Sequence, residues 1–400
     1  MSHVGERQPD DEAGNAEHAG RENDSGHAER APRSRIYETV QRRLQAWVLA
    51  YGRFRRQWYA LPLLLVVLFG FLLVLPFLLN VTVMGVPVGA ALTVHTLVLT
   101  LIWATAAQAW NITSGYAGRF SLGHAAFFGL GAYVPILLIE QFALNPWLGM
   151  LVGGVVATLY GLVIGVLCFR FRVRGAYFVL ATLAFAELLR YVFLNVSRLG
   201  GASGFVRPLP AEYAHDYGLL AFQFTSDLQY YYVILAFLAV VTGISFAIRY
   251  SRFGLYLLAV RENEQAARAL GIPAVRLKLW AFGVSAFFTA WVGSFWGMYF
   301  SSIRPEVIFD LLVNIEILLP AIVGGLGTVL GPILGSLVVT PAAEVARRTS
   351  DLAGLDQVIY GVFLILIALY SPGGVRSWPG RLVDLLGLRA ETGERDETES

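Results

Sequence analysis

The chain alternates between long apolar segments and short polar ones. Most apolar segments approach or exceed about 18 residues, the length that a helix needs to cross a hydrocarbon layer of about 30 Å. They are continuously apolar and do not alternate between apolar and polar positions, which argues against a membrane β-barrel. We predict ten spanning helices, at residues 61–79, 88–109, 122–139, 147–168, 176–195, 229–248, 279–300, 308–323, 329–345 and 356–371.

The composition agrees with that pattern. Of the 400 residues, 56% are hydrophobic and only 14% are charged, whereas soluble domains contain about 45–50% apolar and about 25% charged residues. The predicted fold class is therefore all-α, a polytopic helical membrane protein. The single cysteine, Cys168, cannot form an internal disulfide and is expected to be a small buried residue.

Arginine positions set the orientation of the ten predicted crossings, which place both termini on the same side of the membrane. If the N-terminal arginines are cytoplasmic, then Arg119, the arginines at 170–174 and the charged segment 249–278 are cytoplasmic as well. Most positive charge then lies inside, as the positive-inside rule requires. Arg347 and Arg348 fall outside and are the main exception.

The two ends of the chain differ in character from the apolar middle. Residues 1–35 contain no aromatic residue and are rich in charged and polar ones, so we expect them to be disordered. Residues 36–58 place apolar side chains at three- and four-residue steps with arginines between them, which predicts a basic amphipathic helix on the membrane surface. A helical lead-in without lipid contact is the alternative. Residues 376–400 are expected to be a cytoplasmic tail.

The transmembrane domain is assigned to residues 59–375. It contains two substantial connections, an outer loop at 197–228 and an inner loop at 249–278. Glycine, proline and mixed charges in the outer loop indicate an ordered cap or contact surface.

Motifs of enzymes are missing from the sequence. It contains no G-x-x-x-x-G-K-[ST] loop that could hold the phosphates of ATP. Its six histidines are scattered, and no pair has metal-ligand spacing within one element. We therefore expect no catalytic site, no metal and no cofactor bound by this chain, and no nucleic acid partner. Membrane lipid is the expected surrounding.

Two apolar stretches are interrupted by glycines, one in each half of the chain. The first, NITSGYAGRFSLGHAAFFGLGAY (Asn111 to Tyr133), contains Gly115, Gly118, Gly123, Gly129 and Gly131. The second, ILLPAIVGGLGTVLGPILGS (Ile317 to Ser336), includes Gly324, Gly325 and Gly327. Paired interruptions of this kind are typical of a transport pathway, but glycine also serves close helix packing. Both roles fit the pattern equally well. For His124 we expect a hydrogen bond that fixes helix packing.

Few ionisable residues lie inside the apolar segments, and such residues are costly in a membrane. Glu187 and Arg190 are three positions apart and can pair on one helix face. Glu316 is the better candidate for a pathway residue, with an interhelical hydrogen bond as the alternative.

The inner loop contains a predicted helix from Glu262 to Leu270. Glu264 precedes Arg268 by four residues, the favourable order for an ion pair on a helix. Gly271 and then Pro273 give a stop signal. A compact helix of this kind, rich in alanine, can dock in a groove of a cytoplasmic partner. An ordinary solvated loop is the alternative, and the start and stop signals favour docking.

Four segments, in this order and spacing, resemble the M-type (LivM-like) membrane permease of branched-chain amino acid ABC importers. They are NITSGYAGRFSLGHAAFFGLGAY, RGAYFVLATLAFAELLR, SRFGLYLLAVRENEQAARALGI and IEILLPAIVGGLGTVLGPILG, and the resemblance extends from about residue 90 to residue 375. It differs at Arg119 and Phe120, where the family commonly has two apolar residues.

The resemblance implies a multi-pass protein of the bacterial inner membrane with several partners. These are a second homologous permease subunit, two cytoplasmic ATPase subunits that bind ATP and Mg, and a periplasmic substrate-binding protein. It also implies that a surface of the inner loop couples to an ATPase, formed by Arg261, Glu262, Asn263, Glu264, Ala267, Arg268 and Gly271.

The resemblance leaves the substrate open, because related permeases carry urea or short-chain amides. From another class, a self-contained secondary transporter or channel is the alternative. That alternative requires ion sites at the membrane midplane, for which Glu187 and Glu316 are the acidic candidates.

Overall fold

The computed structural model describes residues 60–78, 82–83, 86–87, 93–206, 218–349, 354, 358–359 and 361–362. All of them belong to one compact unit, Arg53–Ser400. The predicted tail 1–35, the surface helix 36–58, the C-terminal tail 376–400 and most of the predicted span 356–371 lie outside the described residues.

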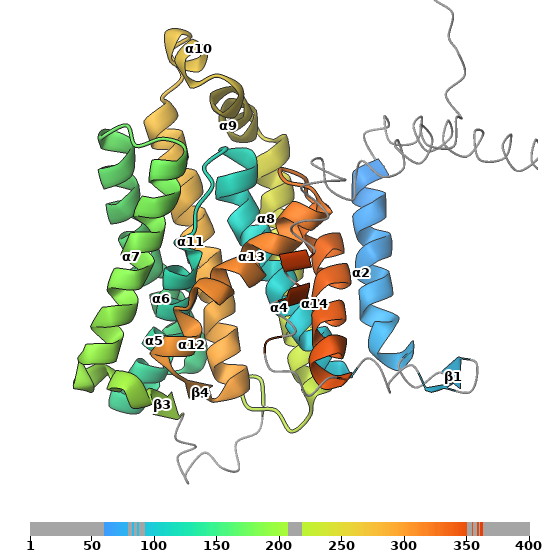
Figure 1. Cartoon of the computed structure of the whole chain (residues 1–400). Coiled ribbons are helices and arrows are strands. Elements are labelled where there is room, and N and C mark those ends of the chain that lie inside the picture. Colours follow the sequence, from blue (N-terminus) through green and yellow to red (C-terminus); the bar gives the residue numbers. More distant parts are fainter. Residues whose placement is uncertain are drawn as a thin grey trace, which may run out of the picture. The chain divides into compact units, whose positions relative to one another are not determined.

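Helices dominate the described part of the chain (Figure 1). They are α2 (Ala60–Leu78), α4 (Val94–Asn111), α5 (His124–Phe142), α6 (Pro146–Arg170), α7 (Ala176–Asn195), α8 (Asp227–Tyr250), α9 (Arg252–Glu262), α10 (Glu264–Ala269), α11 (Ala274–Phe300), α12 (Pro305–Ile308), α13 (Leu311–Gly324) and α14 (Gly331–Thr349).

The short strands form two antiparallel pairs in the connections. β1 (Thr82–Val83) pairs with β2 (Val86–Pro87), and β3 (Phe205–Val206) pairs with β4 (Ser302–Ile303). The second pair joins the connection that follows α7 to the end of α11, so it fixes part of the predicted outer loop.

Seven helical segments in the described residues are long and apolar enough to cross a membrane. They are α2, α5, α6, α7, α8, α11 and the broken pair α12–α13, and each coincides with a predicted span. The chain is therefore an all-α polytopic membrane protein. The total of ten crossings and the cytoplasmic position of both termini stay predictions.

The predicted span 88–109 differs most from the structure. The helix there is α4, which begins only at Val94, after its cap Thr93 accepts a hydrogen bond from the backbone N–H of Thr96 at 3.3 Å. Every residue from Thr96 to Asn111 is buried. Helices α8, α11, α13 and α14 all pack against it. Its threonines, alanines and Gln108 suit contact with other helices more than contact with lipid.

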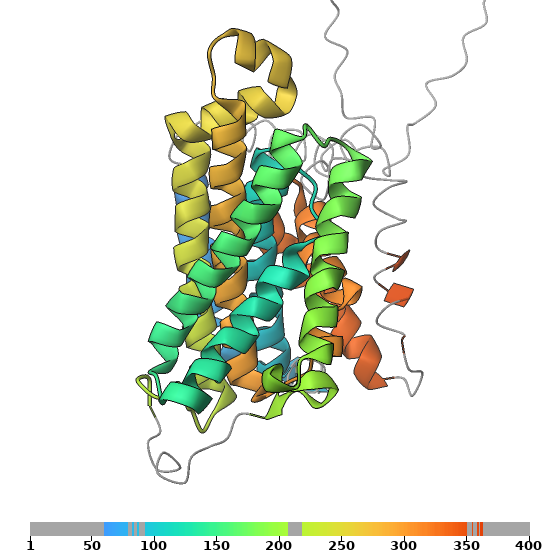
Figure 2. The same ribbon diagram turned by 90° about the vertical axis from the view of Figure 1, so that its left-hand side faces the viewer.

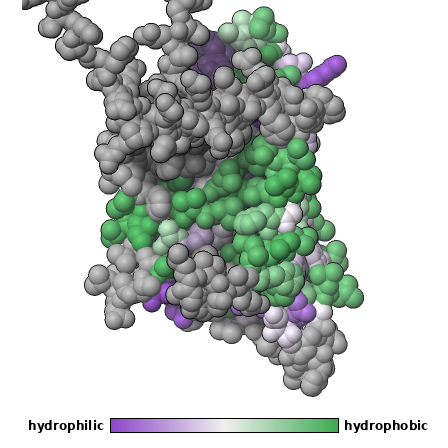
Figure 3. All heavy atoms as spheres, turned by 90° about the vertical axis from the view of Figure 1, so that its right-hand side faces the viewer, coloured by the Kyte–Doolittle hydropathy of each residue, from purple (hydrophilic) through white to green (hydrophobic). Residues whose placement is uncertain are grey.

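Exposure separates the inner helices from those at the surface. The share of the apolar segment that is buried is only 11% in α2 and 22% in α7, compared with 67% in α11. The face shown in Figure 3 has hydrophobic side chains across its middle and hydrophilic ones toward both ends. This pattern is that of a surface in contact with a lipid layer.

Helices α9 and α10 project from the bundle beyond the ends of α8 and α11 (Figures 1 and 2). The prediction of one helix from Glu262 to Leu270 is wrong in its start. Glu262 ends α9, and Asn263 takes an extended conformation with φ −151°. The Asn263 side chain then caps α10, accepting hydrogen bonds from the N–H groups of Gln265 and Ala266 at 3.0 Å each. The predicted stop is confirmed, since Gly271 has φ +81°.

Candidate functional site

The first glycine-rich stretch is a break between two helices and not one spanning helix. After α4 ends at Asn111, the chain continues as a π-helix, η1 (Ile112–Tyr116). Residues 117–123 are irregular, and α5 begins at His124. Gly118 takes φ +66°, a conformation that favours glycine. The predicted span 122–139 is therefore the helix α5 alone.

The second glycine-rich stretch is the turn between α13 and α14. Gly325 and Gly327 have φ +115° and +76°. The Thr328 hydroxyl donates to the Gly325 carbonyl at 2.8 Å and accepts from the Gly331 N–H at 3.0 Å. These bonds stabilise a compact turn.

The two stretches meet, although more than 200 residues separate them in the sequence. The Asn111 side-chain amide donates to the Thr328 carbonyl at 2.8 Å, and its oxygen accepts from the Gly327 N–H at 2.8 Å. A Cβ atom on Gly327 would lie 3.0 Å from the Gly115 carbonyl oxygen, and one on Gly115 would lie 2.7 Å from the Gly327 nitrogen. Glycine at both positions therefore allows the two backbones to touch. We call this contact the glycine junction.

Arg261, at the end of α9, inserts its side chain into the glycine junction. Its guanidinium donates a hydrogen bond to the Gly115 carbonyl. A Cβ on Gly118 would lie 2.7 Å from Arg261 Cγ, and one on Gly327 would lie 2.6 Å from Arg261 Nη1. The projecting helices are thus joined to both glycine-rich stretches by one residue.

Glu264, at the start of α10, forms ion pairs with three cationic side chains. Its carboxylate lies 2.5 Å from the Arg119 guanidinium, 2.6 Å from that of Arg268 and 2.8 Å from Lys278 Nζ. The predicted pair of Glu264 and Arg268 is thereby confirmed. Burial alone would raise the pKa of the Glu264 carboxyl, but the hydrogen bond and charge of Lys278, together with Arg119 and Arg268, lower it overall.

The residues proposed for ATPase coupling divide into two groups. Arg261 and Glu264 point their functional groups toward the bundle, and Ala267 is buried. Glu262, Asn263 and Gly271 are exposed, and Arg268 is partly so. The second group can face a partner directly, and so can the exposed part of the Arg261 side chain. Sequence spacing did not provide this division.

His124 connects three helices at the start of α5. Its Nε2 lies 2.8 Å from the Ser285 hydroxyl of α11, which in turn donates to the Ala109 carbonyl of α4 at 2.7 Å. Its Nδ1 lies 3.2 Å from the Ser121 hydroxyl. The predicted packing hydrogen bond is confirmed. In the described part of the chain, no group of three or more His, Cys, Asp or Glu residues could hold a metal ion.

The other predicted glycines lie where neighbouring atoms leave little space. An added Cβ would lie 1.9 Å from the Ala290 carbonyl oxygen at Gly131, 2.1 Å from the Phe309 ring at Gly129 and 2.9 Å from the Thr182 carbonyl oxygen at Gly123. At Gly324 it would lie 1.7 Å from the Gly331 carbonyl oxygen. These distances account for the glycines as packing positions, and their part in a pathway stays a prediction.

The acidic pathway candidates lie on different helices. Glu187 pairs with Arg190 at 2.8 Å on α7, the predicted pairing. Glu316 is half-buried on α13. Two residues before it, Asn314 is buried and its side-chain oxygen accepts from the Ala125 N–H at 2.9 Å.

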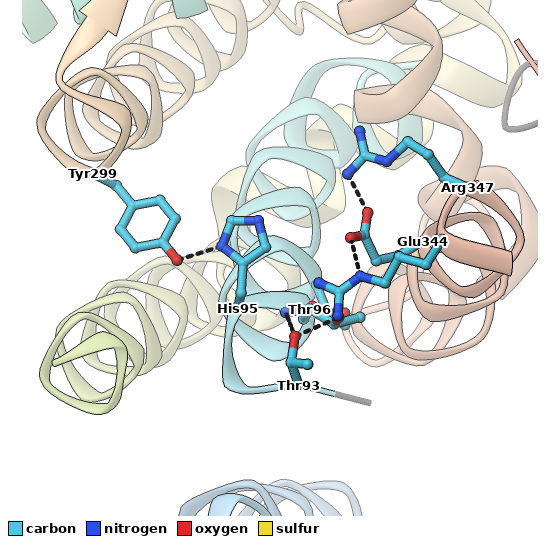
Figure 4. A network of polar contacts seen from close by, with 8 residues as sticks. Thr93, His95, Thr96, Tyr299, Glu344 and Arg347 are labelled. Atoms are coloured by element: carbon cyan, nitrogen blue, oxygen red, sulfur yellow. Dashed lines mark hydrogen bonds and ion pairs between the residues drawn. The ribbon is translucent and has the colours of Figure 1, made fainter. Parts of the chain in front are cut away.

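A polar network at the opposite end of α4 was not predicted. His95 Nδ1 lies 2.5 Å from the Tyr299 hydroxyl of α11. On the other side of α4, Glu344 of α14 pairs with Arg347 and, at 2.8 Å, with Arg348 (Figure 4). The carboxylate partly neutralises the two arginines that the predicted topology places outside. Glu344 precedes Arg347 by three residues and Arg348 by four, a spacing from which these ion pairs could have been predicted.

Comparison with known proteins places the chain from the start of α4 onward in one family. Residues 92–368 match the model of the family described as branched-chain amino acid transport system / permease component. The chain is 27% identical to the high-affinity branched-chain amino acid transport system permease protein LivM of Escherichia coli (strain K12), over 71% of this chain and 69% of that protein.

Two further relatives differ in how much of their length is matched. The high-affinity branched-chain amino acid transport system permease protein LivH of Escherichia coli (strain K12) is 24% identical over 69% of this chain and 92% of its own length. BraD of Pseudomonas aeruginosa is 29% identical over 38% of this chain and 49% of its own length. No solved structure matches. Since the family model covers more than half of the sequence, the chain belongs to the family of branched-chain amino acid transport system permease components.

Proposed function

We propose that the chain is the membrane permease subunit of an ATP-driven importer of branched-chain or other apolar amino acids. The observation that carries the proposal is the family match, which extends over residues 92–368 and so includes both glycine-rich stretches and the inner loop. The chain works without an ATP site of its own, and ATP with Mg binds to separate subunits.

The partner set follows from that assignment. A second homologous permease subunit, two cytoplasmic ATPase subunits and a periplasmic binding protein complete the importer in the bacterial inner membrane. The similarity of this chain to both LivM and LivH of one bacterium supports pairing with a related permease.

Helices α9 and α10 are the proposed contact with an ATPase subunit. They project from the bundle (Figure 2), and Leu270 at the end of α10 is 82% exposed. Exposed Glu262, Gln265 and Ala266 surround the same region. An exposed apolar side chain with polar neighbours is a suitable docking anchor.

The side chains of α9 and α10 that contact the bundle are proposed to transmit movements of the ATPase subunit to it. When an ATPase subunit moves α9 and α10, Arg261 transmits the displacement to the glycine junction. Glu264 transmits it to Arg119 and, through Lys278, to α11. Because ion pairs and hydrogen bonds fix both contacts, the coupling does not require a flexible loop to push on the bundle.

Transport by the reconstituted importer tests this function. The chain is incorporated into vesicles with a partner permease, the ATPases and the binding protein, and uptake of labelled leucine is followed with and without ATP. We expect uptake to require ATP hydrolysis. Uptake by this chain alone, driven by an ion gradient, would instead identify a secondary transporter. ATP-dependent uptake of urea or short amides without leucine uptake would reassign the substrate.

Replacing Leu270 by aspartate tests the docking surface separately. The charge should weaken ATPase binding, while the exposed position should leave the fold unchanged. The matched control is L220D, because Leu220 is also exposed but lies in the connection before α8, at the end of α8 opposite to α9. Equal ATPase binding by wild type and L270D would exclude this surface.

A further inference from the structure

A groove of about 450 Å³ lies on the surface of the bundle between α6 and α11. Thr158 and Leu162 of α6 form one side, and Trp280, Gly283 and Phe287 of α11 form the other. The Thr158 hydroxyl donates to the Gly154 carbonyl of its own helix at 2.8 Å, so its polar atom is already satisfied. The volume is within the range of about 300–1,000 Å³ that small-molecule sites have.

One end of the groove is positively charged. Arg276, in the first turn of α11, lines the groove, is exposed and forms no ion pair with any residue that the structure describes. Trp280 follows one turn later and is 68% exposed. Tryptophan is enriched at the depth where lipid headgroups meet the hydrocarbon, and arginine extends its charge toward the headgroups from the same depth.

The length of the groove discriminates between two possible occupants. From Arg276 to Phe287, α11 advances by eleven residues, which at about 1.5 Å each is roughly 16 Å. This distance is about half of the hydrocarbon thickness of about 30 Å, the depth of one leaflet. A spanning helix of a second subunit would be expected to pack along the full thickness, whereas a lipid chain occupies only one leaflet.

We propose that this groove binds an anionic phospholipid of the cytoplasmic leaflet. One acyl chain lies along Leu162, Gly283 and Phe287, and the Arg276 guanidinium contacts the headgroup phosphate. A basic pocket between helices on the cytoplasmic side is the arrangement that recognises anionic headgroups. A Cβ on Gly283 would lie 3.5 Å from Thr158 and 3.6 Å from Leu162, so a larger side chain at this position would extend into the space between α6 and α11.

Native mass spectrometry of the full-length chain tests the proposal, with phosphatidylglycerol and phosphatidylethanolamine as probes. We expect phosphatidylglycerol to bind more tightly. R276Q should weaken that binding about fivefold, the effect of one cation near a charged headgroup, and bring the two lipids to similar affinity. G283L should weaken both lipids by filling the groove. R170Q is the matched control, because Arg170 is exposed at the same end of the bundle but does not line the groove.

Three results would overturn the proposal. The first is unchanged phosphatidylglycerol binding in both R276Q and G283L. The second is equal affinity of wild type for the two lipids, because the groove would then select no anionic headgroup. The third comes from the assembled importer: if T158C is cross-linked to the partner permease with high yield, a protein and not a lipid covers the groove. Circular dichroism of each variant confirms that the helices are retained.

Discussion

Replacing Glu264 by glutamine is the substitution whose consequences the structure defines most fully. The carboxylate is the partner of Arg119, Arg268 and Lys278 at 2.5 to 2.8 Å. The Lys278 side chain is only 3% exposed, and that of Arg119 only 13%. E264Q keeps the size of the side chain but leaves these cations without the negative charge that compensates them.

The expected cost follows from the burial of the cations that remain. Removing one partner of a buried ion pair destabilises a protein by about 3–5 kcal/mol. The lower end, about 3 kcal/mol, applies here for two reasons. Arg268 is 34% exposed and can turn toward water, and Lys278 also lies 5.0 Å above the centre of the Phe169 ring. A loss of that size corresponds to a Tm lower by about 5–10 °C.

The assay combines thermal unfolding of the purified chain with ATP-dependent uptake by the reconstituted importer. E262Q is the control for thermal unfolding, because Glu262 is exposed and a surface change of this kind stays within about 0.5 kcal/mol. In the double variant E264Q/K278M, the uncompensated lysine is also removed, so part of the lost stability should return. If E264Q melts together with wild type, the buried cluster does not stabilise the junction of α10 and α11, and the reasoning is refuted.

Three other predictions follow from the same structure. First, lowering the pH should reproduce part of the E264Q effect: the pKa of Glu264 is lowered on folding, so its contribution is complete above about pH 4.3 and is lost as the pH falls through the folded value. Melting curves of wild type and E264Q should therefore converge in acid, and a constant gap between them would contradict the assignment. Second, G327A should impair ATP-dependent uptake, because Gly327 has φ +76° and an added Cβ would lie 2.6 Å from Arg261 Nη1. The control G243A on α8 has open space at its Cβ and should retain uptake. Equal uptake by the two variants would contradict the claim. Third, Y299F removes the hydroxyl bonded to His95 at 2.5 Å and should cost about 1 kcal/mol of stability by thermal unfolding, with an unchanged Tm as the contrary result.

The apolar segments predicted the lipid-facing helices well, and the reason is physical. A helix in contact with lipid must be apolar around most of its circumference, so α2, α6 and α7 are evident in the sequence. Helix α4 is surrounded by other helices, and protein neighbours tolerate Thr100, Thr105 and Gln108 in its middle. Because α4 is buried among other helices, its sequence is less apolar and its boundaries are harder to predict. The helix begins at Val94, six residues after the predicted start at 88.

The candidate site was predicted as separate parts but not as an assembly. Each glycine-rich stretch is visible alone, whereas the bonds from Asn111 to Gly327 and Thr328 join positions that no local pattern relates. Arg261 is exposed like its neighbours in the inner loop, and spacing does not show where the end of its long side chain points. Only the folded chain shows that its guanidinium bonds to the carbonyl of Gly115.

The inward contacts of α9 and α10 converge on one short segment. Arg261 bonds to Gly115 and Glu264 to Arg119, two positions only four residues apart in the connection between α4 and α5. That connection begins with the π-helix η1, a conformation that occurs mainly as short pieces at functional sites. Asn111, at its start, is bonded to the turn between α13 and α14. A displacement of the projecting helices would therefore move this segment from two points at once. Because Asn111 also ends α4, the displacement would move the end of α4 together with the turn between α13 and α14.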